Sequence, residues 1–286
     1  MCRYKKIIGA ILAFTVLCSL CVLPAGAGYD GESRAVIGAN LSEEQVANVY
    51  SMFGIERGEV EELTVTNEEE REYLEGIVSE SAIGTRSISC VLIKMLPENE
   101  GLSLETTNIN WCTDEIYQNA LITAGIYDAE VIVAAPFEVS GTAALTGIYK
   151  AYEDVTGEEL SEDAKTTAVE ELVITSDLAD EIGSADAALI VNELKSILDE
   201  TANMTDEELR EEIRNIAANL EITLTEDQID QLVSLVRQLE KLDTDELISK
   251  VQSLQDAVKR MSDSGFFDKI LSFFRSIGDF FANLFN

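Results

Sequence analysis

The chain has 286 residues, enough for one or two apolar cores, and 46% hydrophobic residues with only 3 prolines are typical of a folded globular protein. Its 54 acidic and 20 basic residues give a formal net charge of −34, which excludes a nucleic-acid partner because phosphate binding needs stripes of Lys and Arg. There is no histidine, so Ser-His-Asp and Cys-His nucleophile systems and imidazole metal ligands are excluded.

The N-terminal segment 1–27 has the pattern of a secretory signal peptide. Three basic residues precede an apolar run over residues 7–23. Pro24 and the small residues 25–27, which end at Ala27, follow this run. This pattern predicts cleavage after Ala27, so that the mature protein begins at Gly28 and is secreted or held at the outer face of the cell envelope. The alternative is a retained membrane anchor, since about 17 apolar residues is the lower limit for a transmembrane helix.

Residues 28–155 alternate short strand-like runs with amphipathic helical runs. Strands are expected at residues 35–40, 60–67, 87–96, 104–110 and 129–135, and helices from residue 42, from residue 68, over 113–124 and from residue 141. A strand, helix, strand, helix order with short connections predicts a right-handed parallel crossover unit. The turn-rich stretch 97–101 predicts a hairpin between the two strands that flank it. The expected fold is an α/β or α+β domain with a mixed sheet.

Two cysteines remain after removal of the signal peptide, which contains three of the five in the chain. They are Cys90 and Cys112, and an even pair in an exported protein predicts one disulfide. A hairpin that turns near Gly101 would place them opposite each other, within the Cα separation of ~5.5 Å that a disulfide requires.

The loop after the strand at 129–135 carries the candidate ligand-binding residues Glu138, Ser140, Gly141 and Thr142. It leaves the C-terminal end of a predicted parallel strand, the edge where ligands of open α/β sheets gather, and it opens a helix whose free N–H groups can bind an anion. The alternative is that Ser140 only caps the helix and Gly141 only permits close packing. A single Ser-Gly-Thr lacks the P-loop pattern, so nucleotide binding is not expected.

Several motifs between residues 36 and 195 are shared with a known family. They are GANLSEEQ, VTNEEEREYL, IGTRSIS, YQNALITAGIYDAEVIVAAPFEVSGTAALTGIYKAYE and TGEEL. On these motifs the chain resembles the YpuA-like family of exported Gram-positive bacterial proteins, the domain of unknown function 1002. The resemblance implies secretion and a shared fold. It implies no activity, catalytic residue or cofactor, because none is established for the family.

Residues 156–263 are expected to form helices only. Capping boxes begin at Thr205 and Thr225, where a hydroxyl precedes a Glu or Gln by three residues. Apolar stripes at helical spacing follow, and they predict a small antiparallel helical bundle. This region would form an all-helical C-terminal extension of the mixed-sheet domain.

The C-terminal segment 264–286 is predicted to be an amphipathic helix that contacts a membrane surface or a protein partner. Its apolar side holds seven of the ten phenylalanines of the chain, a larger patch than a soluble monomer leaves uncovered. The proposed contact residues are Phe266, Phe267, Ile270, Phe273, Phe274, Ile277, Phe280, Phe281 and Phe285. The alternative is that this helix docks on the preceding helical region.

The functional hypothesis is a non-catalytic binding protein, extracellular or associated with the cell envelope. One alternative is a carboxylate-dependent hydrolase of a wall or glycan substrate. Another is an assembly factor that binds a membrane or partner through the C-terminal helix. The sequence shows no cofactor motif and no metal-ligand spacing, although its many carboxylates leave a divalent cation open.

We predict that the exported protein lacks residues 1–27, because the small residues up to Ala27 follow an apolar run of signal-peptide length. Intact-mass spectrometry of protein recovered outside the cell checks the cleavage. Recovery of the full-length chain outside the cell would contradict it.

Overall fold

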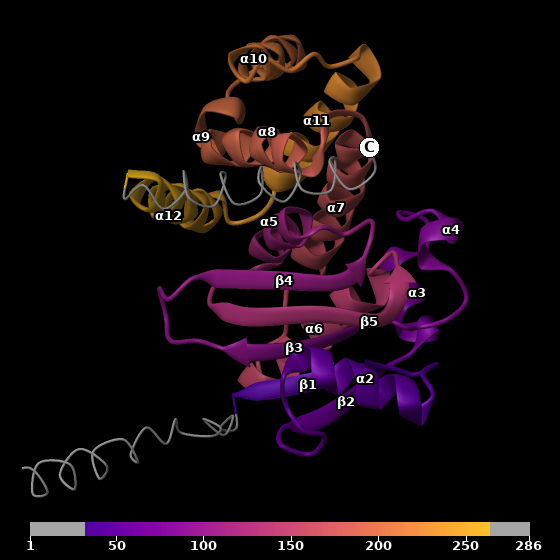
Figure 1. Ribbon diagram of the computed structural model, residues 1–286. Helices are drawn as coiled ribbons and strands as arrows, with labels where there is room; N and C mark the ends of the chain where they lie inside the picture. The colour runs from indigo at the N-terminus through magenta and orange to yellow at the C-terminus, as the bar shows by residue number, and fades with distance from the viewer. Residues whose placement is uncertain (1–31, 264–286) are drawn as a thin grey trace, which may run out of the picture.

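The computed structural model describes residues 32–263, with side chains through Ser253. The signal peptide expected at 1–27 and the Phe-rich segment 264–286 lie outside the described residues. Within the described range, no helix has both the length and the apolar character needed to cross a membrane. A mixed sheet with covering helices is followed by a group of helices on one side of it (Figure 1).

The sheet has five strands in the order β2-β1-β3-β5-β4. The strands are β1 (Ser33–Gly38), β2 (Glu61–Val65), β3 (Cys90–Met95), β4 (Leu102–Ile109) and β5 (Ala129–Val139). β1 and β2 are parallel, β4 and β5 are parallel, and β3 lies antiparallel between β1 and β5. The predicted mixed sheet is therefore confirmed.

The helices divide into those that belong to the sheet region and those that follow it. The first group is α2 (Glu43–Phe53), α3 (Asn67–Leu74), α4 (Glu80–Ile83), α5 (Asp114–Ala124) and α6 (Thr142–Thr156). The second group is α7 (Glu162–Ile182), α8 (Ser184–Ser196), α9 (Leu198–Thr201), α10 (Asp206–Asn219), α11 (Glu226–Leu239) and α12 (Thr244–Asp263). The described chain thus becomes helical after α6, near the expected residue 156.

Two parallel crossover units, β1-α2-β2 and β4-α5-β5, lie on either side of β3 in the sheet, where the element order predicted one such unit. Their helices cover opposite faces. α2 packs on the face that includes Ala35, Ile37 and Leu92. α5 and α6 share a core with Val36 and Val91 on the other face, and Gly147 lets α6 approach closely, because a Cβ there would lie 3.3 Å from each valine.

The predicted hairpin between β3 and β4 is wrong, because β5 lies between them and pairs with both. The reason is the burial that each strand requires. β5 carries apolar residues on both faces, which favours a central position. β4 alternates buried leucines with exposed polar residues, which suits the edge of the sheet.

The predicted disulfide between Cys90 and Cys112 is also wrong, since both are buried free thiols. Cys90 belongs to the apolar cluster under α2, whereas Cys112 belongs to the cluster on the α5 and α6 face. The sheet separates the two side chains, and without the β3–β4 hairpin nothing places them opposite each other.

A buried ion pair joins the helical region to the sheet region. The Lys195 ammonium of α8 lies 2.6 Å from a carboxylate oxygen of Glu171 on α7, and both side chains have no exposed surface. Lys195 also donates to the Asn119 carbonyl of α5 at 2.8 Å, and the Thr123 hydroxyl of α5 donates to Glu171 at 2.5 Å. Three helices therefore meet at one pair of charges.

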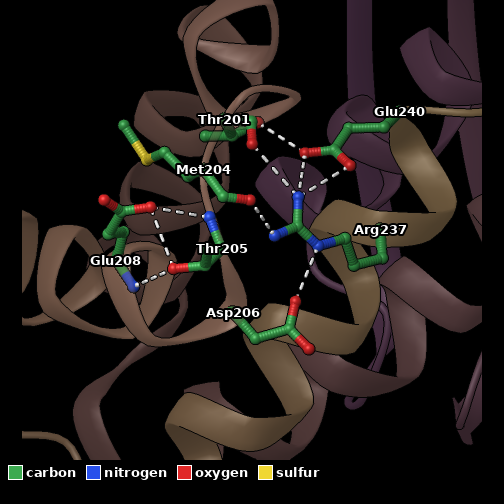
Figure 2. Close-up of polar contacts among 7 residues, drawn as sticks. All are labelled: Thr201, Met204, Thr205, Asp206, Glu208, Arg237 and Glu240. Atoms are coloured by element: carbon green, nitrogen blue, oxygen red, sulfur yellow. Dashed lines mark hydrogen bonds and ion pairs between the residues drawn. The ribbon is translucent and has the colours of Figure 1, made fainter.

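Farther from the sheet, Arg237 of α11 holds the α9–α10 connection in place. Figure 2 shows its guanidinium donating to the Thr201 and Met204 carbonyls at 3.1 and 2.8 Å. The same group pairs with Asp206 and Glu240 at 3.0 and 2.8 Å. The Thr201 carbonyl at the end of α9, which also accepts from the Met204 N–H, and the Met204 carbonyl of the connection thus each gain a charged donor.

We predict that Lys195→Met destabilises the protein by about 3–5 kcal/mol, because it leaves the Glu171 carboxylate buried without its cation. Adding Glu171→Leu should recover a large part of this loss, since two apolar side chains of similar size leave no uncompensated charge. Urea denaturation measures both. An unchanged unfolding midpoint for Lys195→Met would show that the pair is not needed.

Candidate functional site

The candidate ligand-binding residues at the end of β5 are placed together around the start of α6, except that Glu138 lies exposed on the strand. Gly141 is the N-cap residue, with a φ of 104° that favours glycine. A Cβ at Gly141 would lie 2.6 Å from the Tyr117 hydroxyl oxygen, which donates to the Gly141 carbonyl. The expected close packing at this glycine is confirmed.

The hydroxyls of Ser140 and Thr142 bind within the chain. Both donate to the Ala82 carbonyl of α4, at 2.7 and 3.3 Å. The Ser140 side chain does not cap α6, so the expectation that Ser140 caps this helix is wrong. The Ala144 N–H in the first turn of α6 donates to the Ser89 hydroxyl at 2.9 Å. Ligand binding by these residues stays a prediction.

A fully buried carboxyl group, Glu70 of α3, lies against the same helix start. Its Oε2 accepts from Asn67 Nδ2 at 3.1 Å, whereas its Oε1 has no hydrogen-bond partner in the described part of the chain. Burial raises the pKa of Glu70, although the hydrogen bond from Asn67 opposes the shift. The sequence signal for this burial is weak: Glu70 lies four residues before the buried Leu74 and so shares its helix face.

A cleft of about 400 Å³ opens where the sheet region meets the later helices. Its walls come from the α5–β5 turn, the α6–α7 loop, the first turn of α7 and the α11–α12 turn. The charged and aromatic residues in the lining are Tyr127, Glu159, Asp163, Lys241, Asp243 and Glu246. The sequence did not predict this site, because its residues come from three separate segments, 123–127, 159–164 and 241–247.

Local structure fixes each wall of the cleft. Gly125 ends α5 with a φ of 98°, which turns the chain toward Tyr127 and β5. Ser161 caps α7, and the Asp243 side chain accepts from the Glu246 N–H at 3.2 Å at the start of α12. Asp163 and Glu246 therefore lie in the first turns of helices whose N-terminal ends are capped.

A second hollow of about 190 Å³ adjoins the cleft and shares Asp163, Lys241 and Leu242 with it. It adds Glu170, which lies seven residues after Asp163 on α7. Two helical turns separate these carboxylates by about 10 Å along the helix axis. The two hollows form one groove along α7, called the acidic groove below.

The acidic groove is electrically negative at Tyr127. Burial is the main cause that raises the pKa of the Tyr127 hydroxyl, and the charges of Glu246 and Asp243 raise it further. The ring of Tyr127 already binds a cation of the chain: the Lys250 ammonium of α12 lies 4.9 Å from the ring centroid and 3.7 Å from a carboxylate oxygen of Asp128.

The carboxylates of the acidic groove do not form a metal centre. Among the described residues, no three Asp, Glu or Cys side chains come close enough together to hold a metal ion. The groove thus offers separate negative charges along its length rather than one chelating cluster.

Comparison with known proteins places the chain in a family. The model of the family described as "Protein of unknown function (DUF1002)" matches residues 37–257. The chain belongs to the DUF1002 family. It is 39% identical over 293 residues to the uncharacterized protein YpuA of Bacillus subtilis (strain 168), an alignment that spans 98% of this chain and 99% of the relative. No solved structure matches at a significant level.

These comparisons confirm the resemblance seen in the sequence motifs. They indicate no activity for the chain, because neither the description of the DUF1002 family nor the name of the relative states one. The function proposed for this DUF1002 protein therefore rests on the geometry of the groove.

We predict that Glu70→Gln gains stability relative to the wild type as the pH rises from about 4 to about 7. Burial raises the pKa of Glu70 in the folded state above the value of about 4.3 in the unfolded chain. The stability from this proton is complete below the unfolded pKa and is lost as the pH rises through the folded pKa. Gln keeps the shape without the charge.

Urea denaturation across this pH range measures the difference. Glu72→Gln is the matched control, since Glu72 is exposed on the same helix α3. Parallel stability profiles for wild type and Glu70→Gln would contradict the prediction.

Proposed function

We propose that this DUF1002 protein is an exported, non-catalytic binding protein of the cell envelope and that it binds its ligand in the acidic groove. The observation that carries the proposal is the cleft of about 400 Å³ between the sheet region and the later helices. Its size lies within the range of small-ligand sites, which occur preferentially where two structural units meet.

The positions of the perturbed carboxyl groups favour binding over catalysis. A general acid or base needs a tuned pKa at the site of reaction. Four described carboxyl groups have a raised pKa, and none of them lines the acidic groove: Glu70, Asp114, Glu171 and Asp177. Burial is the first cause in each case, and Glu70 and Glu171 have no exposed surface from which to reach a substrate.

Export is supported by the signal-peptide pattern of residues 1–27, including the small residues up to Ala27. The Phe-rich pattern of residues 264–286 favours a second candidate function, assembly on a membrane or protein partner. The two functions use different parts of the chain, so one experiment separates them.

We predict that Ala164→Phe abolishes sedimentation of the mature protein, residues 28–286, with a cell-envelope fraction. Ala164 lines the cleft from the first turn of α7, so a phenyl ring there fills part of the ligand space. Ala47→Phe is the matched control, because it places the same ring on an exposed position of α2. Unfolding midpoints confirm that both variants fold.

Deletion of residues 265–286 is tested beside them. Loss of sedimentation in the deletion but not in Ala164→Phe would assign binding to the C-terminal segment and overturn the role of the groove. Equal sedimentation of Ala164→Phe and Ala47→Phe would also overturn it.

A further inference from the structure

We infer that the ligand of the acidic groove carries two or more separated aliphatic ammonium groups, as a linear polyamine or a run of lysine side chains does. The inference rests on the proposed function and names the ligand class. It is drawn from the shape of the groove, its unpaired carboxylates and the ammonium already bound beside the groove.

The groove carboxylates are available for a ligand. Within the described side chains, Glu159, Asp163 and Glu246 form no ion pair with a basic residue of the chain. Arg214 of α10 and Arg237 of α11 are paired with acidic side chains outside the groove. These two cations therefore do not neutralise the carboxylates of the groove.

The arrangement of the charges selects a ligand with several positive groups. The carboxylates do not converge on one point, so a single metal ion cannot satisfy them. Asp163 and Glu170 lie on one helix with about 10 Å between them along its axis. A flexible chain with an ammonium group at each end can reach both, and the hydroxyl-bearing Thr166 and Thr167 lie between them.

Beside the groove, the chain itself holds one ammonium group. Tyr127 lines the cleft, and together with the adjacent Asp128 it holds Lys250 through one aromatic face and one carboxylate. Glu246 and Asp243 add negative potential at the same tyrosine. An ammonium group of a ligand in the cleft meets this negative potential.

Lys241 divides the groove. It lies where the cleft and the second hollow meet, and its ammonium donates to Gln238 at 2.5 Å. Its charge repels a cation at the centre and leaves the two ends favourable, which selects ligands whose charges are spaced apart. Removing this charge should strengthen binding of a polyammonium ligand.

The test is isothermal titration of the mature protein, residues 28–286, with spermine, tetralysine and Ca²⁺. Physiological ionic strength is used so that diffuse attraction to the acidic surface is screened beyond about 8 Å. We expect spermine or tetralysine to bind saturably at one site, and the tighter of the two identifies a free polyamine or a lysine-bearing peptide as the source.

Substitutions locate the site. Asp163→Asn and Glu246→Gln should each weaken binding about tenfold, the loss expected for one charge-assisted hydrogen bond. Glu44→Gln makes the same change of net charge on an exposed position of α2 and should change affinity less than about twofold. Lys241→Met should tighten binding, whereas Arg86→Met, a charge loss beside Asn40, should not.

Three outcomes overturn the inference: no saturable binding of either polyammonium probe, equal weakening by the groove variants and Glu44→Gln, or displacement of the probes by stoichiometric Ca²⁺. If these occur while Ala164→Phe still abolishes envelope sedimentation, the ligand class is wrong and the binding function stands. If Ala164→Phe leaves sedimentation unchanged, the proposed function itself is wrong.

Discussion

The buried pair of Glu171 and Lys195 is the constraint on which the arrangement of the molecule depends. It fixes α7 and α8 against α5, the crossover helix of the β4-α5-β5 unit. Burial raises the pKa of Glu171 and lowers that of Lys195, so desolvation opposes the charged state that their attraction favours. A pair of this kind adds little net stability compared with apolar side chains, but an arrangement that separates the two charges is strongly disfavoured.

This constraint also positions the acidic groove. The Thr123 hydroxyl donates to Glu171 on the inner side of α5, and Thr123 is at the same time part of the cleft lining. Two residues later, Gly125 turns the chain into Tyr127 and β5. The C-terminal end of α5 thus contacts the buried ion pair and also lines the cleft, through Thr123 in both cases. A shift of α7 relative to α5 would change both the ion pair and the cleft.

The parts of the fold that sequence predicted well are those set by local patterns. The element order predicted one parallel crossover unit, and the structure has two. The capping boxes at Thr205 and Thr225 mark the starts of α10 and α11. The β3–β4 pairing failed because a turn-rich stretch reports only a change of direction. The apolar character of β5 on both faces already implied a central strand, and it was the better guide to the sheet order.

The site was harder to predict for the same reason. Ser140, Gly141 and Thr142 are adjacent in sequence, so a local pattern indicated them. Their polar groups nevertheless form hydrogen bonds within the chain: the two hydroxyls donate to the Ala82 carbonyl, and the Gly141 carbonyl accepts from the Tyr117 hydroxyl. The groove residues lie in three segments spread between residues 123 and 247, and these segments share no motif. Only tertiary packing, which no local pattern encodes, brings them to one surface.

Net charge shows why placement matters more than composition. A formal charge of −34 implies attraction for any cation, and at physiological salt that attraction is confined to about 8 Å. Specific recognition therefore requires several carboxylates within reach of one ligand, without basic partners of their own. In the described helical region, Arg210, Arg214 and Arg237 all pair with acids away from the groove. Among the described residues that line the groove, Lys241 is the one basic side chain, so an excess of negative charge remains there. The proposed recognition of a polyammonium ligand requires this excess.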